Sequence, residues 1–402
     1  MAGGQGLRQS MKILQVVSSF KPAWETGGTN RVVYEHSRSL VEKGHKVTVF
    51  TTDRGRKRVN SPKNRPVIVD NIQVYYFRNI SNYLARKKII TPYYLPLIAR
   101  KEVKEFDIIH VHEPRTLVAP IIHHYAVKYS IPYVLQAHGS LTTFFQKRWL
   151  KRTFDVVWGY QILKDASKLV AVTKTEAEQY KSMGVNEDKI EIIPNGIDLF
   201  EFDNLPQKGE FKGKYGLGDD QRILLYLGRI NKIKGLDLLA RGFADLSSTL
   251  KDIKLVMVGP DDGYLSSLQK LVTTLEISDK VLFTGPLYGR EKLEAYVDAE
   301  VYVLPSFYET FPVAVLEAFA CGIPVIVTDR CGIADVINGQ AGLVVPYDKD
   351  QLKHALLKML EDTKMRQGFG EKGRLLVREK YNWGTIAGQI ERLYLNCLSP
   401  AQ

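Results

Sequence analysis

The sequence predicts an α/β protein built from two doubly wound domains in tandem. Short runs that are apolar at nearly every position recur along the chain, and stretches with a helical pattern separate them. Such continuous apolar runs are typical of parallel strands that helices cover on both faces. The rhythm stops and restarts near Pro194-Asn195-Gly196, which divides the strands into two sets.

The predicted strands follow in order along each half of the chain. The first set is expected at residues 12–20, 46–52, 107–112, 133–139, 168–173 and 190–198. The second set is expected at residues 222–229, 254–259, 281–285, 301–306 and 324–328. Parallel strands joined by helices wind right-handed, so each set forms one sheet between two helical layers. We therefore expect an N-terminal domain over residues 1–197 and a C-terminal domain over residues 198–402.

Composition narrows the class of protein. The chain has 402 residues, of which 45% are hydrophobic and 25% are charged, as in ordinary globular proteins. No apolar run approaches the roughly 20 residues that a membrane-spanning helix needs. The opening "MAGGQGLRQS" lacks the apolar core of a signal peptide. Cys321, Cys331 and Cys397 form no close pair, which fits a reducing compartment, so we expect a cytoplasmic protein.

The net charge of +12 is unevenly distributed. Residues 1–200 hold 31 Lys and Arg against 17 Asp and Glu, whereas the remaining residues hold 25 against 27. The basic half could meet nucleic acid, anionic lipid or phosphorylated substrates. No nucleic-acid recognition motif accompanies the basic residues, so we expect no nucleic-acid partner.

One basic stretch, "FFQKRWLKRTF" (144–154), is amphipathic. Its aromatic residues lie near one helical face and its Lys and Arg residues lie towards the other. This pattern suits a membrane surface that carries anionic lipid, and it also suits a helix that packs its apolar face on the core. An anionic membrane surface on the cytoplasmic side is therefore a candidate partner of the N-terminal domain.

A glycine-containing loop follows the first predicted strand of each half of the chain. In "ETGGTNRVVYEHSRSL", Gly27 and Gly28 permit close backbone approach, and the helix beginning near Thr29 offers free amides to an anion. A plain strand-to-helix turn explains this loop as well. In "LGRINKIKG", Arg229 and Lys234 could hold a diphosphate without a metal, although solvated loop charges are the simpler alternative.

The stretch "SFYETFPVAVLEAFACGIPVI" (306–326) carries two carboxylates, eight residues apart, in an otherwise uncharged run. Phe311-Pro312 is expected to begin a helix, because proline is favoured in the first turn. Glu309 then lies in the preceding loop and Glu317 on the helix. An unpartnered buried carboxylate is costly, so each needs a role. The alternatives are helix capping for Glu309 and an exposed helix face for Glu317.

Polar residues at the strand ends complete the set. His112, His138 and Arg229 are expected to open onto a cleft between the domains. His110 and His112 share one strand face, where a structural or acceptor-side role is expected rather than a metal site. His123-His124 is expected on a helix surface. Asp348 and Asp350 are interpreted as a helix start, so no metal is expected.

These motifs, in this order, resemble the retaining glycosyltransferases of family 4, which have the GT-B fold of two Rossmann-like domains facing a central cleft. The resemblance covers nearly the whole chain from Met11. Besides the Glu309-x7-Glu317 pair, it rests on "GHKVTVFTT" (44–52), "HVHEP" (110–114), "AHGS" (137–140), "IPNGID" (193–198) and "LEAFACGIPVIVTD" (316–329).

The resemblance implies roles for individual residues. Arg229 and Lys234 would bind the donor diphosphate, Glu309 the sugar hydroxyls and Glu317 the ribose hydroxyls. His138 would lie beside the transferring sugar, and the implied catalytic residues are His138, Arg229, Lys234 and Glu309. The implied donor-binding residues are Gly27, Gly28, Gly228, Arg229, Lys234, Gly285, Leu287, Glu309, Thr310, Phe311, Val313 and Glu317. Pro312 has no amide to donate, so the phosphate contact is placed on Val313 or Ala314; Thr310 stands where the family often has glycine.

The resemblance also implies an activity. The enzyme would move a hexose-type sugar from a nucleotide-diphosphate sugar to a glycan or lipid-linked hydroxyl with retention of configuration, without cofactor or metal. The N-terminal domain would receive the acceptor, and the last helix, about residues 381–398, would pack back on it. The alternatives are a nucleotide-sugar epimerase with the GT-B fold and a non-catalytic protein that binds sugar nucleotides or RNA.

Overall fold

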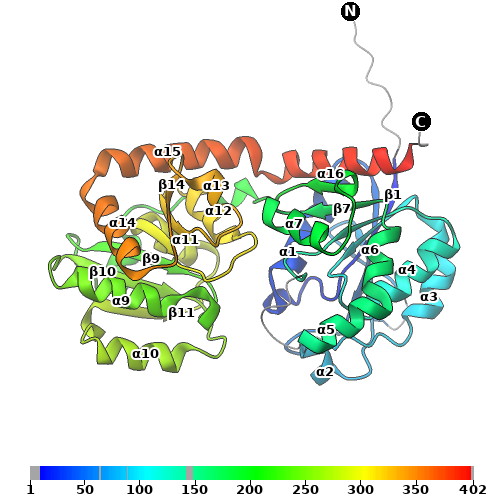
Figure 1. Cartoon of the computed structure of the whole chain (residues 1–402), viewed down its shortest axis with the longest axis horizontal. Coiled ribbons are helices and arrows are strands. Elements are labelled where there is room, and N and C mark those ends of the chain that lie inside the picture. Colours follow the sequence, from blue (N-terminus) through cyan, green and yellow to red (C-terminus); the bar gives the residue numbers. More distant parts are fainter. Residues whose placement is uncertain (1–9, 63–64, 88, 142–147, 400–402) are drawn as a thin grey trace, which may run out of the picture. The chain divides into compact units, whose positions relative to one another are not determined.

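The computed structural model describes residues 10–62, 65–87, 89–141 and 148–399 (Figure 1). The chain divides into two compact units. Unit 1 comprises Met1–Asn195 and Trp383–Gln402, and unit 2 comprises Gly196–Asn382. The C-terminal helix α16 (Trp383–Leu398) therefore belongs to unit 1, where it packs beside helix α1 (Gly28–Glu42).

Unit 1 contains an eight-stranded sheet with the order β3-β4-β2-β1-β5-β6-β7-β8. All neighbouring strands are parallel except β3 and β4, which are antiparallel. The six strands predicted for this half are present, and β3 and β4 were not predicted. The strands are β1 (Lys12–Val16), β2 (Lys46–Thr52), β3 (Val67–Val69), β4 (Ile72–Phe77), β5 (Ile108–His112), β6 (Tyr133–Gln136), β7 (Lys168–Ala171) and β8 (Ile190–Ile192).

Helices cover both faces of this sheet. Alternate residues of β1 enter different cores: Leu14 and Val16 pack into one, and Ile13 packs with α1 and α16 into the other. The first core also receives helices α3, α4 and α6. The remaining helices of unit 1 are α2 (Asn82–Arg86), α3 (Leu95–Glu102), α4 (Val118–Lys128), α5 (Arg148–Phe154), α6 (Tyr160–Asp165) and α7 (Lys174–Ser182).

Unit 2 contains a six-stranded sheet, wholly parallel, with the order β11-β10-β9-β12-β13-β14. The five predicted strands are present, and β14 was not predicted. The strands are β9 (Arg222–Leu227), β10 (Ile253–Val258), β11 (Val281–Gly285), β12 (Ala299–Leu304), β13 (Val325–Thr328) and β14 (Gly342–Val345).

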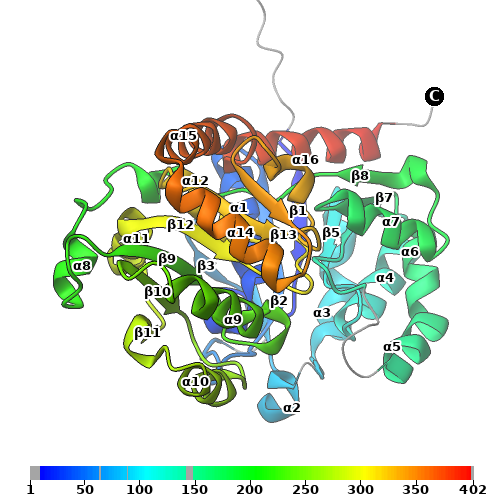
Figure 2. The same ribbon diagram turned by 60° about the vertical axis from the view of Figure 1, so that its left-hand side comes forward.

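Helix α9 of unit 2 packs beside α10 and α14, and α12 packs against α15 (Figure 2). The helices are α8 (Glu210–Lys214), α9 (Leu236–Ser247), α10 (Leu265–Thr274), α11 (Gly289–Asp298), α12 (Val313–Ala320), α13 (Ala334–Ile337), α14 (Lys349–Glu361) and α15 (Thr363–Lys380). Helix α12 begins at Val313, and Pro312 is its N-cap residue, so the prediction that Phe311-Pro312 begins the helix was two residues early.

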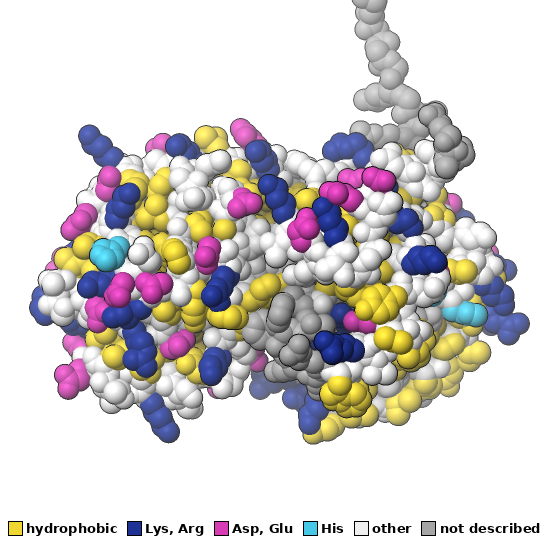
Figure 3. All heavy atoms as spheres, in the orientation of Figure 1, with side chains coloured by type: hydrophobic (Ala, Val, Ile, Leu, Met, Phe, Trp, Pro, Cys, Tyr) yellow, Lys and Arg dark blue, Asp and Glu magenta, His cyan; other side chains and the backbone are white. Residues whose placement is uncertain are grey.

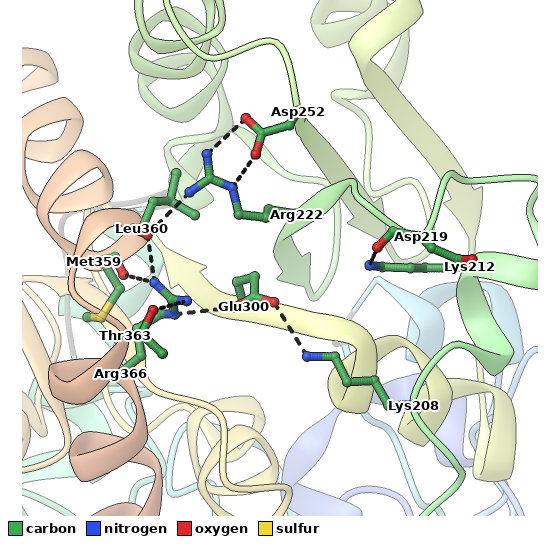
Figure 4. A network of polar contacts seen from close by, with 10 residues as sticks. All are labelled: Lys208, Lys212, Asp219, Arg222, Asp252, Glu300, Met359, Leu360, Thr363 and Arg366. Atoms are coloured by element: carbon green, nitrogen blue, oxygen red, sulfur yellow. Dashed lines mark hydrogen bonds and ion pairs between the residues drawn. The ribbon is translucent and has the colours of Figure 1, made fainter.

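A network of polar contacts fixes the amino ends of two strands of unit 2 (Figure 4). Arg222, which begins β9, forms two hydrogen bonds of 2.6 and 2.8 Å with the carboxylate of Asp252. Arg366 of α15 donates to the carbonyls of Met359 and Leu360 and pairs with Glu300 at the start of β12. These contacts connect the α14–α15 junction to the sheet and leave the carboxyl ends of the strands for other residues.

None of the helices in the described part of the chain combines the length and apolar character that crossing a bilayer requires.

Candidate functional site

The carboxyl edge of the unit 2 sheet gathers most of the predicted donor-binding residues. Gly228 and Arg229 follow β9, Gly285 ends β11, and the loop that carries Glu309 follows β12. Because neighbouring parallel strands end at the same edge of a sheet, these residues belong to one region, which is where open α/β sheets bind ligands.

A glycine allows two loops at this edge to touch. Gly235 has φ of +65°, and a Cβ built on it would lie 2.0 Å from the carbonyl oxygen of Pro305. The backbone amide of Phe307 donates to the carbonyl oxygen of Ile233 over 2.8 Å, which joins the same loops. Only a residue without a Cβ permits this approach. The residue before it, Lys234, is thereby brought to the loop after β12.

Lys234 and Glu309 form an ion pair and hydrogen bond. Their side chains are 15% and 17% exposed, so most of each is removed from water while an edge remains accessible. The backbone of Glu309 is fixed on both sides, because its amide donates to Arg330 (3.2 Å) and its carbonyl accepts from Gly332 (2.8 Å). The structure thus brings two predicted catalytic residues together on a rigid loop.

Arg229 lies nearby in the chain but is much more exposed, at 64% of its side chain. It pairs with Asp262, which follows β10, over 2.7 Å, and the amide of Asn231 donates to the same carboxylate. Asp262 was not predicted as a site residue. The Asp262 carboxylate holds the Arg229 guanidinium in place without burying it. The other N–H groups of Arg229 therefore remain available to an anion.

The backbone between β9 and β10 is also tightly packed. The amide of Gly228 donates to Val258 over 2.9 Å, and a Cβ on Gly259 would lie 1.8 Å from the carbonyl oxygen of Gly228. Below this turn, the hydroxyl of Tyr226 donates to the carbonyl of Arg229 and that of Tyr302 to the carbonyl of Leu227. Burial raises the pKa of both tyrosines, so both hydroxyls remain donors.

Glu317, on α12, is only 8% exposed, so the alternative of an exposed helix face was wrong. Its carboxylate accepts from Lys292 over 2.7 Å and from the hydroxyl of Tyr296 over 3.1 Å. Both partners lie on α11, four residues apart and therefore on one helix face. Burial is the main cause that raises the pKa of Tyr296, and the negative charge of Glu317 is the second. Sequence reasoning missed Lys292; the i, i+4 spacing with Tyr296 was the available signal.

The other predicted donor-binding residues of unit 2 lie in the same loops. Gly285 has φ of +75° at the end of β11, and Leu287 is buried. The Thr310 hydroxyl contacts that of Tyr308 over 3.3 Å, and buried Phe311 packs on Tyr381. Val313 begins α12, so its amide is among the free donors of that helix.

In unit 1, the predicted glycines form the start of α1. Gly27 has φ of +143° and is the N-cap residue, and Gly28 begins the helix. Both are exposed, and a Cβ on either would meet no atom within 4 Å. The buried amide of Asn30 donates to the carbonyl of Ala23 (2.6 Å) and to the hydroxyl of Thr26 (2.8 Å), which fixes the preceding turn. The helix therefore presents an ordered, accessible N-terminus.

His138 follows β6 at the carboxyl edge of the unit 1 sheet, with φ of +51°. Glu176, which is fully buried, holds this turn by accepting from the amides of Gly139 (2.5 Å) and Val172 (2.8 Å). Burial raises the pKa of Glu176. Burial lowers the pKa of His138 to about 3, so its imidazole is neutral at physiological pH.

His112 was expected to open onto a cleft, and that expectation was wrong. Helix α1 covers it, and only 1% of the residue is exposed. Its Nδ1 lies 2.8 Å from Nε2 of His138, and its Nε2 lies 2.8 Å from Oε1 of Gln15. His123 contacts Asp165 over 2.9 Å, and His124 is exposed on α4, as expected for a helix surface.

Two of the other predictions have structural outcomes. Asp348 is the N-cap residue of α14 and accepts from the amides of Asp350 and Gln351, so the predicted helix start is confirmed. The predicted amphipathic segment 144–154 lies partly outside the described residues, and its described part is α5.

Comparison with known proteins identifies the family. Residues 26–200 match the family described as Glycosyltransferase Family 4, and residues 207–376 match Glycosyl transferases group 1. The chain belongs to the family 4 glycosyltransferases. Over 394 residues, this glycosyltransferase is 27% identical to an uncharacterized glycosyltransferase of Methanocaldococcus jannaschii, covering 96% of this chain and 98% of that protein.

A second relative is a D-inositol 3-phosphate glycosyltransferase of Kineococcus radiotolerans, 25% identical over 92% of this chain and 90% of that protein. Among solved structures, sucrose-phosphate synthase of Thermosynechococcus elongatus has a TM-score of 0.76 at 23% identity, covering 97% of this chain and all of that one. WaaG, a glycosyltransferase of lipopolysaccharide biosynthesis, has a TM-score of 0.69 at 19% identity, covering 95% of this chain and 99% of that one. These likenesses and the two Rossmann-like units establish the GT-B fold.

Proposed function

We propose that this glycosyltransferase moves a hexose-type sugar from a nucleotide-diphosphate sugar to a hydroxyl acceptor with retention of anomeric configuration. The observation that carries this proposal is the Lys234–Glu309 pair, fixed at the same carboxyl edge of the unit 2 sheet that carries the exposed guanidinium of Arg229. Cations next to a carboxylate suit a ligand that has a diphosphate at one end and hydroxyl groups at the other.

The chemical step demands stabilisation of a leaving group. When the bond between the anomeric carbon and the phosphate oxygen breaks, its electron pair goes to the departing nucleoside diphosphate. Lys234 and Arg229 stabilise that charge most strongly in the transition state, together with the amides of Val313 and Ala314. The acceptor hydroxyl forms its new bond on the same face of the sugar, and its proton passes to the departing phosphate.

The two carboxylates bind opposite ends of the donor in this proposal. Glu309 accepts hydrogen bonds from sugar hydroxyls, while Glu317 accepts them from the ribose. Lys292 and Tyr296 hold Glu317 in place, and each carboxylate oxygen retains a second lone pair for a hydroxyl. The remaining predicted catalytic residue, His138 of unit 1, has a neutral imidazole, and its role at the transferred sugar stays a prediction.

The relatives suggest which donor to try first. HepE of Anabaena, which has a TM-score of 0.75 at 18% identity over 96% of this chain and all of that one, is described in complex with UDP-glucose. An α-monoglucosyldiacylglycerol synthase of Streptococcus pneumoniae is 27% identical over 80% of this chain and 72% of that protein. These relatives favour a uridine diphosphate sugar and make a lipid-linked acceptor a sensible first choice.

The test is release of nucleotide from UDP-, GDP- and ADP-sugars, with and without membrane lipid extract. One donor should be consumed, and Glu309→Ala should lower the rate by about 10²–10³-fold, as expected for loss of a polar contact made in the transition state. Glu361→Ala, an exposed carboxylate at the end of α14, is the matched control and should retain full activity.

Two outcomes would refute the proposal. Wild-type turnover in Glu309→Ala would remove the assigned role of that residue. Conversion of the donor to another nucleotide sugar, without nucleotide release, would instead identify an epimerase. The anomeric coupling constant of the product, measured by NMR, tests retention separately.

The surface of unit 1 supports a membrane-bound acceptor. Large apolar side chains are exposed on α2, α3, α5 and the π-helical turn Asp155–Gly159 that follows α5. Figure 3 shows hydrophobic side chains gathered at the lower right, over the region where Figure 1 labels these helices. Trp149 and Val156 are 70% and 74% exposed, so these two side chains do not pack on the core.

Basic residues accompany this apolar surface. They are Arg86 at the end of α2, Arg100 and Lys101 at the end of α3, and Lys151 and Arg152 on α5. Exposed aromatic and aliphatic groups beside cations suit the surface of an anionic bilayer, where apolar groups enter the interface and cations meet the headgroups. We propose that unit 1 binds such a surface and receives a lipid-linked acceptor from it.

Co-sedimentation with vesicles tests this second proposal. Binding should be stronger to anionic than to zwitterionic vesicles and should weaken with salt. Trp149→Ser combined with Val156→Ser should weaken binding by about tenfold or more, because each removes apolar area from the interface. Phe200→Ser, which changes an aromatic residue of unit 2 that is 84% exposed, is the control. Equal binding by both variants, or no binding by the wild type at low salt, would refute the proposal.

A further inference from the structure

A polar cluster interrupts the core beneath α1 and α16. On this face of the unit 1 sheet, β1 and β5 contribute Ile13 and Ile108 and then, one pair further along the same two strands, Gln15 and His110. His112, at the end of β5, continues the polar row. All three polar residues are at most 1% exposed. A row of buried polar groups in an otherwise apolar layer needs partners.

Helix α1 adds a third imidazole. His36 is 1% exposed and faces both strand histidines, with ring centroids 6.2 Å from those of His110 and His112. The rings of His110 and His112 lie 4.1 Å apart. Within the part of the chain that the structure describes, these three side chains each offer one nitrogen atom, and the three atoms lie within 4.8 Å of one another.

Two ring nitrogens of the cluster, Nδ1 of His36 and Nε2 of His110, have no hydrogen-bond partner among the described residues, and both are shielded from solvent. Gln136, which pairs with His112 on the neighbouring strand β6, also has a buried side-chain oxygen without a partner. Leaving a buried polar atom unsatisfied costs about 1–3 kcal/mol. Two unsatisfied imidazole nitrogens in one small space indicate a common ligand.

The second ring nitrogen of His110 is already held. Nδ1 of His110 contacts the hydroxyl of Tyr394, on α16, over 2.7 Å, and that hydroxyl accepts from the amide of Gln15 over 3.1 Å. The ring of Trp383 packs edge-on against His36 at 5.1 Å and closes the cluster from the α16 side. Histidines that bind metal ions have such contacts on the second ring nitrogen, which fix the ring and its tautomer.

We propose that His36, His110 and His112 bind a transition-metal ion, with Zn²⁺ as the best match. Imidazole nitrogen is a preferred donor for zinc, and Zn–N bonds of about 2.0–2.1 Å in a tetrahedron place ligand atoms about 3.4 Å apart. The cluster therefore needs to contract by little more than 1 Å from its upper spacing of 4.8 Å. His112 contributes one nitrogen by giving up one of its two hydrogen bonds, and water fills the fourth position.

The ion would link helix α1 to strand β5 and stabilise unit 1. This role is separate from the donor chemistry proposed above, because none of the three histidines is assigned to the donor. His112 nevertheless contacts His138, which was assigned a catalytic role, over 2.8 Å. The sequence pattern of His110 and His112 did not indicate a site, since the third ligand, His36, comes from a distant helix.

The first measurement is metal content. Protein without a histidine tag is purified from cells grown with added zinc, or with added cobalt, and is dialysed against metal-free buffer. We expect about one ion per chain, as a three-histidine site requires, and visible absorption bands of nitrogen-coordinated Co²⁺. His36→Leu should lower the metal content at least tenfold, whereas His124→Gln, an exposed histidine on α4, should retain it.

A second readout does not depend on a variant that must fold. The midpoint of thermal unfolding of the wild-type chain should be higher for zinc-loaded protein than for protein from zinc-depleted, chelator-treated cells, since an ion bound only by the folded state stabilises it. A metal content below about a tenth of an ion per chain, together with equal unfolding midpoints, would overturn the proposal. A buried water molecule would then be the group that satisfies the unpaired nitrogens. Equal metal content in His36→Leu and the wild type would also overturn it.

Discussion

Substituting Gly235 by alanine should destabilise unit 2 strongly for so small a change. The new Cβ would lie 2.0 Å from the carbonyl oxygen of Pro305, and the φ of +65° is a conformation that alanine rarely adopts. The left-handed conformation costs about 1–2 kcal/mol, and the restricted unfolded chain returns about 0.4–1 kcal/mol. Displacing a backbone carbonyl adds about 1–3 kcal/mol, as overpacking does, so the net loss is about 2–4 kcal/mol.

The same unit offers a matched control. Gly263 has φ of +85°, and a Cβ on it would meet no atom within 4 Å, so Gly263→Ala carries the conformational cost without the clash. We expect Gly263→Ala to lose about 1 kcal/mol. Thermal unfolding measures both: Gly235→Ala should lower the midpoint by about 6–12 °C, which is two to four times the effect of the control.

Activity provides a second readout of the same contact. Gly235 allows Lys234 to reach Glu309, so the substitution should also lower the rate of nucleotide release, whereas Gly263→Ala should not. A midpoint for Gly235→Ala equal to that of the control would refute the reasoning. It would mean that the loop after β12 can move away from Gly235 at no cost.

The remaining predictions concern unit 1. Glu176→Gln should lower the free energy of unfolding by about 1–3 kcal/mol, because the single oxygen of the amide cannot replace both carboxylate oxygens as acceptors of the two backbone amides. Glu187→Gln, at an exposed carboxylate, should leave the free energy of unfolding unchanged, and equal effects of the two substitutions would contradict this assignment. Arg115→Met should cost about 3–5 kcal/mol in urea unfolding by leaving buried Asp155 unpaired, and a loss below about 1 kcal/mol would show that solvent reaches that carboxylate. Burial lowers the pKa of His36 to about 4 from 6.5, so the unfolded chain binds more protons between these pH values and stability falls as pH falls through them. Between pH 6.5 and pH 5.5 in chelator-containing buffer, the free energy of unfolding should therefore fall by about 1 kcal/mol less in His36→Leu than in the wild type. Parallel plots of the free energy of unfolding against pH would contradict the lowered pKa of His36.

The strands of both sheets could be predicted because buried parallel strands leave a strong signal. Residues 46–52 and 281–285 match β2 and β11, since nearly every side chain there is apolar or small. One missed strand, β4, has six residues and lies inside its sheet, so neither its length nor its position explains the miss. The other two are short and lie at sheet edges: β3 has three residues and β14 has four. Strands with one side unpaired need fewer apolar residues, so they resemble loops in sequence.

The site was less predictable, because the residues that pair with its predicted members come from other parts of the chain. Arg229, Lys234 and Glu309 were predicted as site residues because loops after parallel strands are where such sheets bind ligands, and Glu317 was predicted because a carboxylate in an apolar run needs a role. Their partners could not be identified in this way. Asp262 and Lys292 are ordinary charged residues in sequence, and only the fold brings them to a carboxylate or a guanidinium.

The eight-residue separation of Glu309 and Glu317 now has a physical explanation. The first carboxylate lies in a loop that backbone hydrogen bonds hold, and the second lies more than a turn inside α12. Burying either alone would cost several kcal/mol, and each is therefore paired with a lysine from a different element: Lys234 after β9 and Lys292 on α11. The two pairs differ in exposure and in partners. The first couples a carboxylate to a cation that a diphosphate can capture, which would free Glu309 for the sugar. In the second, Tyr296 also donates to the carboxylate, so Glu317 is held by two partners on α11.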